Sequence, residues 1–128
     1  MPVEVEVLGE PALDPTRVEF LCRAACASRG VEDGHLAVEF VDEAAIAKLN
    51  AEHRGKEGPT DVLSFPVDGT DDLAGAPREL GDIVICPPRT EDLAEAVVHG
   101  TLHLLGMDHE RDEGEMLELQ DELMRRLA

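Results

Sequence analysis

Aromatic residues are almost absent from this chain of 128 residues, which has no tryptophan, no tyrosine and only three phenylalanines. A surface on which several nucleobases stack is therefore not expected, since such surfaces are built from aromatic side chains. Basic residues are scarce too: 11 lysines and arginines stand against 29 acidic residues, for a formal net charge of −18. The field of such a chain repels polyanions, which argues against a free-standing nucleic-acid binder.

Cysteines and long apolar runs are also few. The three cysteines, Cys22, Cys26 and Cys86, are an odd number and contain no Cys-x-x-Cys pair, so we expect buried free thiols and not a disulfide framework or a cysteine metal site. No apolar run approaches the ~20 residues that cross a bilayer. The first ten residues alternate apolar and acidic side chains and do not resemble a signal peptide. We therefore expect a cytoplasmic protein without a membrane partner.

The length and the hydrophobic pattern predict one α/β domain over residues 1–128, in which helices pack on a mixed β-sheet. Alternating valines predict a strand over residues 3–7, and Asp14-Pro15 predicts the start of a helix that Gly30 closes. Further strands are predicted at Leu36–Val41, Val62–Phe65 and Gly81–Cys86, with a short helix after Asp42. Residues 66–80 are rich in proline, glycine and aspartate, and predict a mobile loop.

The last third of the chain predicts two helices. The first begins at Thr90 and is stopped by Gly106. The second is a terminal amphipathic helix that Asp112 and Glu115 introduce as a capping box. The predicted order of elements is therefore βαβαββαα.

Three of the five histidines lie within eleven residues, at His99, His103 and His109. On a helix, positions 99 and 103 project from the same face, so both imidazoles can reach one ion. Gly106 can end the helix in a left-handed conformation and let the chain fold back, so that His109 supplies a third ligand. Three protein ligands leave one position open for water, which is typical of a catalytic zinc site.

The same spacing occurs in metalloproteases, where the residue after the first histidine is the glutamate that acts as general base. Here that residue is Gly100, so peptide hydrolysis by that route is disfavoured. Asp108 and Glu110 flank His109 and could orient a ligand or act as a substitute base. It is equally consistent with the sequence that both residues are solvent-exposed acids on an acidic chain.

Three segments together resemble the YbeY family: the histidine segment, Arg54–Pro66 (RGKEGPTDVLSFP) and Gly81–Ile85 (GDIVI). The resemblance implies a single α/β domain with one Zn²⁺, or another divalent ion, bound by His99, His103 and His109. Family members are bacterial endoribonucleases of single-strand type that act in maturation of the 3′ end of 16S ribosomal RNA and in ribosome quality control. Ribosomal RNA, the small ribosomal subunit and ribosome-associated proteins are the implied partners. Arg54 and His99 are the implied catalytic residues.

The chain departs from the family pattern in a shorter segment before His99, a short C-terminal tail, and Met107 where tyrosine is usual. We expect these changes to alter the shape of one cleft wall and the substrate fit, and to leave the metal site in place.

The residues around Arg54 support its assignment independently. Residues 46–60 hold Lys48, Arg54 and Lys56 against Glu52 and Glu57, so this glycine-rich stretch is locally positive on an acidic chain. The planar guanidinium of Arg54 could clamp a phosphate beside the metal. Because the histidines bind metal only when neutral, activity should fall below about pH 6.

Two alternatives remain open from the sequence. One is a metallopeptidase or another metal hydrolase that uses Asp108 or Glu110 as its base. The other is a ribosome-assembly factor without catalysis, whose metal only holds the C-terminal helix. The acidic charge predicts weak, salt-sensitive RNA affinity, with specificity supplied by the ribosome or a protein partner. The oligomeric state is left open, with a monomer favoured.

Overall fold

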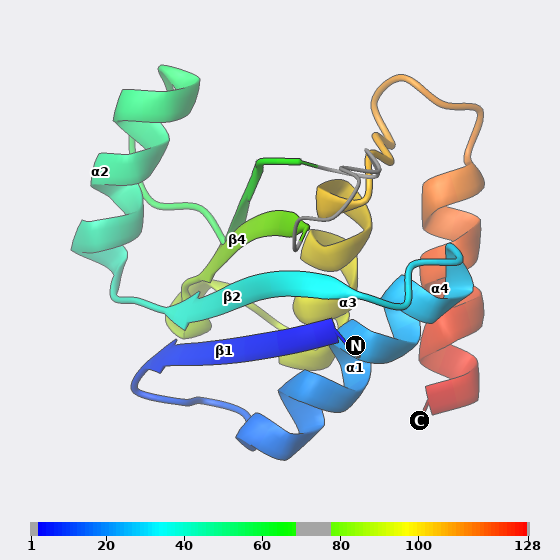
Figure 1. Ribbon diagram of the computed structural model, residues 1–128. Coiled ribbons are helices and arrows are strands. Elements are labelled where there is room, and N and C mark those ends of the chain that lie inside the picture. The colour runs from blue at the N-terminus through cyan, green and yellow to red at the C-terminus, as the bar shows by residue number, and fades with distance from the viewer. Residues whose placement is uncertain (1–2, 69–77, 128) are drawn as a thin grey trace.

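The computed structural model of the chain describes residues 3–68 and 78–127, so the central part of the loop predicted at 66–80 lies outside the described residues. Within them the fold is α/β, and the predicted order of strands and helices is confirmed (Figure 1). The elements are β1 (Val3–Gly9), α1 (Pro15–Ser28), β2 (Gly34–Phe40), α2 (Glu43–Arg54), β3 (Val62–Pro66), β4 (Glu79–Ile85), a 3₁₀ turn at Pro87–Arg89, α3 (Leu93–Leu104) and α4 (Glu115–Leu127).

The four strands form one mixed sheet in the order β1-β2-β4-β3. β1, β2 and β4 run parallel, and β3 pairs antiparallel with β4, which confirms the predicted mixed sheet. β1 and β2 are joined through α1, whereas the chain passes from β2 through α2 and β3 before it reaches β4. No helix in the described ranges is both long and apolar enough to cross a membrane.

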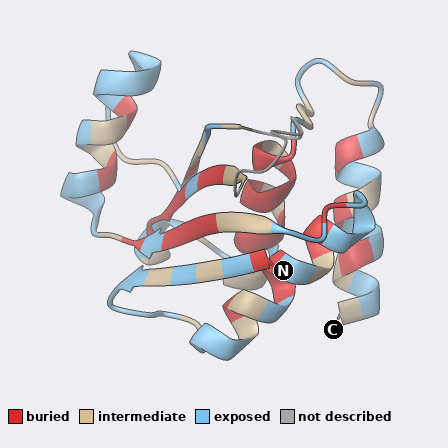
Figure 2. Ribbon diagram, viewed as in Figure 1, coloured by how far each residue is buried: buried red, intermediate tan, exposed pale blue. Residues whose placement is uncertain are grey.

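The two faces of the sheet carry separate apolar clusters because side chains alternate along a strand. Ile83 and Ile85 point to the face covered by α1 and α3, with α4 packed beyond them, and this larger cluster is the main core (Figure 2). Val84 points to the other face, where it meets Ile46 of α2 and Leu63 of β3. The main core therefore fixes α3, the helix that carries two of the three clustered histidines, against the centre of the sheet.

The cysteines behave as predicted. Cys22, Cys26 and Cys86 are buried free thiols. Burial raises the pKa of Cys22 to about 12 and that of Cys26 to about 11. A raised pKa disfavours the thiolate at neutral pH, and both side chains belong to the apolar packing of the main core.

Several predicted boundaries are wrong. α3 begins after Asp92, whose carboxylate accepts from the backbone N–H of Glu95 at 3.0 Å, and not at Thr90. Thr90 instead ends the 3₁₀ turn, and its hydroxyl donates to the carbonyl of Cys86 at 2.8 Å. β2 starts at Gly34 and β4 at Glu79, each two residues earlier than predicted. The hydrophobic pattern does not reveal that Gly34 and Glu79 begin these strands, because neither residue has an apolar side chain and both pair through the backbone.

The predicted capping box before α4 forms only in part. Asp112 accepts from the backbone N–H groups of Gly114 and Met116, both at 2.9 Å. These bonds hold the pKa of Asp112 below its usual value. In a complete capping box the carboxylate of Glu115 would accept from the backbone N–H of Asp112. Here it accepts from the N–H of Glu113 instead.

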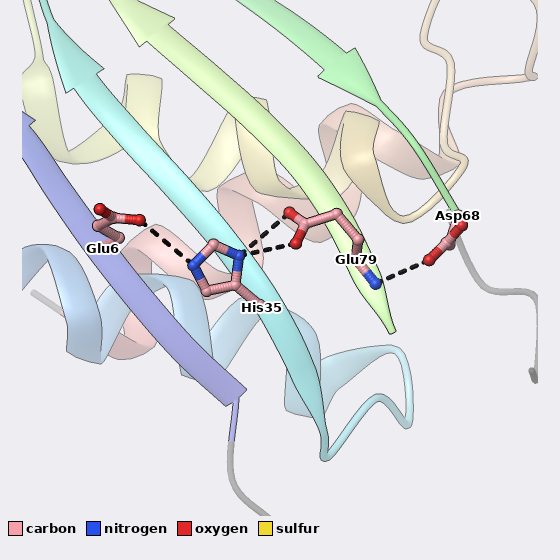
Figure 3. A network of polar contacts seen from close by, with 4 residues as sticks. All are labelled: Glu6, His35, Asp68 and Glu79. Atoms are coloured by element: carbon pink, nitrogen blue, oxygen red, sulfur yellow. Dashed lines mark hydrogen bonds and ion pairs between the residues drawn. The ribbon is translucent and has the colours of Figure 1, made fainter. Parts of the chain in front are cut away.

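A polar network links the neighbouring strands β1, β2 and β4, close to the ends at which β2 and β4 begin (Figure 3). His35 of β2 lies between Glu79 of β4, at 2.9 Å from Nδ1, and Glu6 of β1, at 3.5 Å from Nε2. Asp68 also takes part, since it accepts from the backbone N–H of Glu79. Partial burial disfavours charge on His35, but the hydrogen bond and charge of Glu79, with Glu6, outweigh it and raise the pKa of His35.

This raised pKa predicts a pH-dependent contribution to stability. The charged ring stabilises the fold below the ordinary histidine pKa, and that contribution disappears as pH rises through the raised value. Replacing His35 by glutamine should therefore cost more stability at about pH 5 than at about pH 8.5. The difference should stay below ~1 kcal/mol, because the ion pairs are partly exposed and screened. Urea unfolding of both proteins at both pH values measures it, and equal costs at the two pH values would contradict this role.

Candidate metal centre

The end of α3 brings the histidines together. His99 and His103 are one turn apart, and α3 ends two residues before Gly106, which has a left-handed φ of 93°. The N–H of Gly106 bonds to the carbonyl of His103, and the N–H of Met107 to that of Leu102, which is a Schellman ending. The chain then turns back and places His109 beside the other two rings, as the glycine predicted.

The three imidazoles converge. The Nε2 atoms of His99 and His103 are 3.2 Å apart, and the ring of His109 lies 5.1 and 5.2 Å from theirs, centroid to centroid. One nitrogen from each ring lies within 4.8 Å of the others. Two nitrogens bound tetrahedrally to zinc are roughly 3.3 Å apart, given Zn–N bonds of about 2.0–2.1 Å. Within the described ranges this is the one cluster of its kind, and it could hold a metal ion.

Hydrogen bonds on the outer side of the rings set their orientation. His99 Nδ1 donates to Oε1 of Gln120 at 2.8 Å, and His103 Nδ1 donates to the carbonyl of Met107 at 2.9 Å. Both rings therefore carry their proton on Nδ1 and aim the Nε2 lone pair at the centre of the cluster. Nδ1 of His109 is buried and has no hydrogen-bond partner among the described residues.

Burial, followed by the nearby His99, lowers the pKa of His103. A lowered pKa keeps this imidazole neutral at physiological pH, which is the form that binds metal. The donor set, its spacing and its protonation therefore fit a divalent ion such as zinc.

Gly100 is required by packing. A Cβ atom at this position would lie 2.6 Å from Cγ2 of Ile83, so α3 can approach β4 only with glycine here. The position faces the sheet and has no room for a longer side chain. The glutamate that acts as general base in the metalloprotease pattern therefore has no equivalent carboxylate at position 100.

The histidines line one wall of a cleft of about 1430 Å³. The sides of the cleft come from the end of α2, from β3, from the start of α3 and from the turn after it. Its charged lining is mostly acidic and consists of two arginines and six carboxylates: Arg54 and Arg89, and Asp61, Glu91, Asp92, Glu95, Asp108 and Glu110. Of the charged side chains in the positive stretch predicted around Arg54, only Arg54 itself lines the cleft, whose charged lining is acidic overall.

Arg54 is on the same cleft as the histidines. It is the last residue of α2, which ends at Gly55 with a left-handed φ of 66°. The side-chain amide of Asn50 donates to the carbonyl of Gly58 and ties the following loop back to the helix. Arg54 is exposed and makes no ion pair within the described residues, whereas Arg89 is paired with Glu43 at 2.7 Å. Arg54 is thus available for a ligand in the cleft.

The two candidate bases, Asp108 and Glu110, both line the cleft. The carboxylate of Asp108 is engaged in its own turn, since it accepts from the N–H of Glu110 and lies 3.5 Å from Nε of Arg111. The carboxylate of Glu110 is exposed and makes no hydrogen bond or ion pair in the described part of the chain. Of the two, Glu110 is the freer to take a proton.

Gln120 is the site residue that sequence reasoning missed. It comes from α4, 21 positions after His99, and only 6% of its surface is exposed. The sequence feature that could have identified it is its position, because a glutamine stands one turn after Met116 and one turn before Leu123 on the apolar face of the helix. Such a buried amide needs a partner, because an unsatisfied one is costly.

Comparison with known proteins agrees with the motifs. Residues 12–128 match the family model described as Endoribonuclease YbeY. A protein of that name from Rubrobacter xylanophilus is 45% identical over 97% of this chain and 96% of its own length. Another from Bacillus cytotoxicus is 42% identical over 81% of this chain and 80% of its own.

A solved structure gives the same picture. The solution structure of a Thermotoga maritima protein superimposes with a TM-score of 0.60 at 28% identity, and covers 96% of this chain and 88% of that one. With the matched sequence model and relatives, the shared fold leaves one conclusion: this chain belongs to the YbeY family.

Proposed function

We propose that this protein is a metal-dependent endoribonuclease in which His99, His103 and His109 hold a single zinc ion. The observation that carries the proposal is the convergence of three imidazoles, two of them oriented by hydrogen bonds, on a cleft that also bears Arg54, which makes no ion pair within the described residues. The family supports the same activity, since the matched model and the relatives are described as endoribonucleases.

The metal ligands, Arg54 and Glu110 would have separate roles in the cleavage of a phosphodiester bond. When bound, the ion would supply Lewis-acid chemistry and lower the pKa of a coordinated water. The guanidinium of Arg54 binds the phosphate with its planar fork and stabilises the charge that develops on it. His99 acts as a ligand and thereby takes part in catalysis, and Glu110, whose carboxylate lines the cleft and is uncommitted in the described residues, is the candidate to accept a proton.

The acidic lining bears on how the substrate is recruited. Six carboxylates against two arginines cannot attract RNA strongly by themselves. We propose that residues 1–128 act as one metallohydrolase domain, a cytoplasmic monomer, whose substrate is ribosomal RNA. Specificity for the 3′ end of 16S RNA, and the role in quality control, would come from docking on the small subunit or on a protein bound to it.

A peptidase mechanism is less well supported. In that mechanism the general base follows the first histidine, and here Gly100 is packed against Ile83 with no space for a carboxylate. The alternative without catalysis, in which a metal only holds the C-terminal helix, has one observation in its favour: the contact between His99 and Gln120 of α4.

Metal removal separates these functions. Protein purified without a histidine tag should cleave structured ribosomal RNA, lose cleavage after treatment with a chelator, and regain it when zinc is added back. A peptide library should remain uncut in all three states. Cleavage of RNA by the metal-free protein would refute metal dependence, and a metal-loaded protein that binds the small subunit without cutting RNA would favour the assembly factor.

A further inference from the structure

The C-terminal helix supplies an amide that reaches the metal centre. Gln120 lies between Met116 and Leu123 on the buried face of α4, and is one of three buried polar side chains in the described residues. Its Oε1 accepts from Nδ1 of His99 at 2.8 Å, and the side chain also lines the cleft.

The three histidines differ in what orients them. His103 donates to the carbonyl of Met107, in the turn that ends its own helix, and so is held locally. Nδ1 of His109 has no partner among the described residues. Of the three, His99 alone is oriented by a side chain from a separate helix, which reaches it only when α4 is docked on α3.

We propose that Gln120 is a positioning residue that fixes His99 for metal binding and couples metal affinity to the docking of α4. The proposal rests on the proposed function only in taking His99 as a metal ligand. An amide oxygen can only accept, so it requires the proton of His99 on Nδ1 and leaves Nε2 free for the ion. The bond also restricts rotation of the ring, so less freedom is lost when metal binds.

Thermodynamic linkage makes the coupling reciprocal. If the docked α4 raises the metal affinity of His99, bound metal must stabilise the docking of α4 by the same factor. Gln120 would otherwise be a poor choice for a buried position, where an apolar residue packs without needing a partner. Its burial is explained if the bond to His99 is the reason for its presence.

The test compares zinc affinities, measured by competition with a chromophoric chelator, in full-length variants. Gln120→Met keeps the volume and removes the acceptor, and should weaken zinc binding ~10- to 100-fold, the usual loss for a residue that orients a metal ligand. Gln120→Glu keeps the acceptor and should bind zinc within a few-fold of wild type or more tightly. Met116→Leu, a volume-conserving change one turn earlier, is the matched control and should bind as wild type does.

Hydrogen exchange tests the coupling itself. Zinc should slow exchange of the α4 amides in the wild type and in Met116→Leu, and should have much less effect in Gln120→Met. If Gln120→Met does not fold, Gln120→Asn takes its place, since it keeps the amide but is one methylene too short to reach His99.

The outcomes separate this proposal from the proposed function. Equal zinc affinity in wild type and in Gln120→Met would overturn the positioning role and leave the metal site intact. Equal losses in Gln120→Met and Gln120→Glu would also overturn it, because they would indicate a packing role. A wild-type protein that binds no zinc would overturn both the positioning role and the proposed metal centre.

Discussion

Replacing His103 by alanine should abolish RNA cleavage and lower zinc affinity by well over ~100-fold, beyond the loss expected from a residue that only orients a ligand. The Nε2 atom of His103 lies 3.2 Å from that of His99, and its ring is close to that of His109 as well. Removing it leaves two donors, and a two-ligand site cannot hold the ion in a defined geometry. The loss should therefore be seen in metal content and in activity together.

The fold itself should survive this change. The ring of His103 is only half-buried and does not belong to either apolar cluster, so the circular dichroism spectrum should match that of the wild type. His35→Gln is the matched control, because it also removes a histidine, at a position on the sheet that does not line the cleft. That variant should keep its zinc and its activity. Unchanged cleavage by His103→Ala would show that the activity does not come from this centre.

Replacing Arg54 by alanine should reduce kcat for RNA cleavage by ~100- to 1000-fold, the range seen when one charge-stabilising group is removed from an active site. Arg54 lines the cleft but makes no ion pair in the described residues, and it is not among the grouped metal ligands. Zinc content should therefore stay at the wild-type level, which distinguishes this variant from His103→Ala.

Two further variants show whether the shape of the guanidinium matters or only its charge. Arg54→Lys keeps the charge but loses the bidentate fork, so it should recover only part of the activity. Lys48→Ala removes one positive charge from the same helix at an exposed position outside the cleft, and should leave kcat unchanged. If Arg54→Ala and Lys48→Ala were equally active, the contribution of Arg54 would be general charge and not a contact with phosphate.

Much of the fold follows from local features of the sequence. Asp42 caps α2 through the N–H of Ala45, and Gly106 ends α3 in the left-handed conformation that the histidine spacing requires. Such caps act within a few residues, so they can be read from the chain alone. The convergence of His99, His103 and His109 was predictable for the same reason, because one helical turn and one glycine bring them together.

Features that depend on distant contacts could not be predicted. Gln120 reaches His99 only through the packing of α4 on α3, and the sequence shows it merely as a polar residue on an apolar face. The acidic lining of the cleft is similar, since Asp61, Glu91 and Glu110 come from three separate segments. The positive character of residues 46–60 was visible locally, while the charge of the assembled cleft depends on the tertiary fold.

The tight packing at Gly100 was only partly predictable from the sequence. The sequence showed that a glycine stands where metalloproteases carry glutamate, but not why. The structure supplies the reason, because Ile83 of β4 occupies the space that a side chain would need. Packing in the core thus excludes position 100 as the source of a general base.

Metal analysis of the protein purified without a histidine tag tests the central claim most directly. The account predicts one zinc ion for each chain in the wild type and in His35→Gln, and almost none in His103→Ala. A wild-type protein that carries no divalent metal, binds none when zinc is supplied, and still cleaves RNA would contradict it.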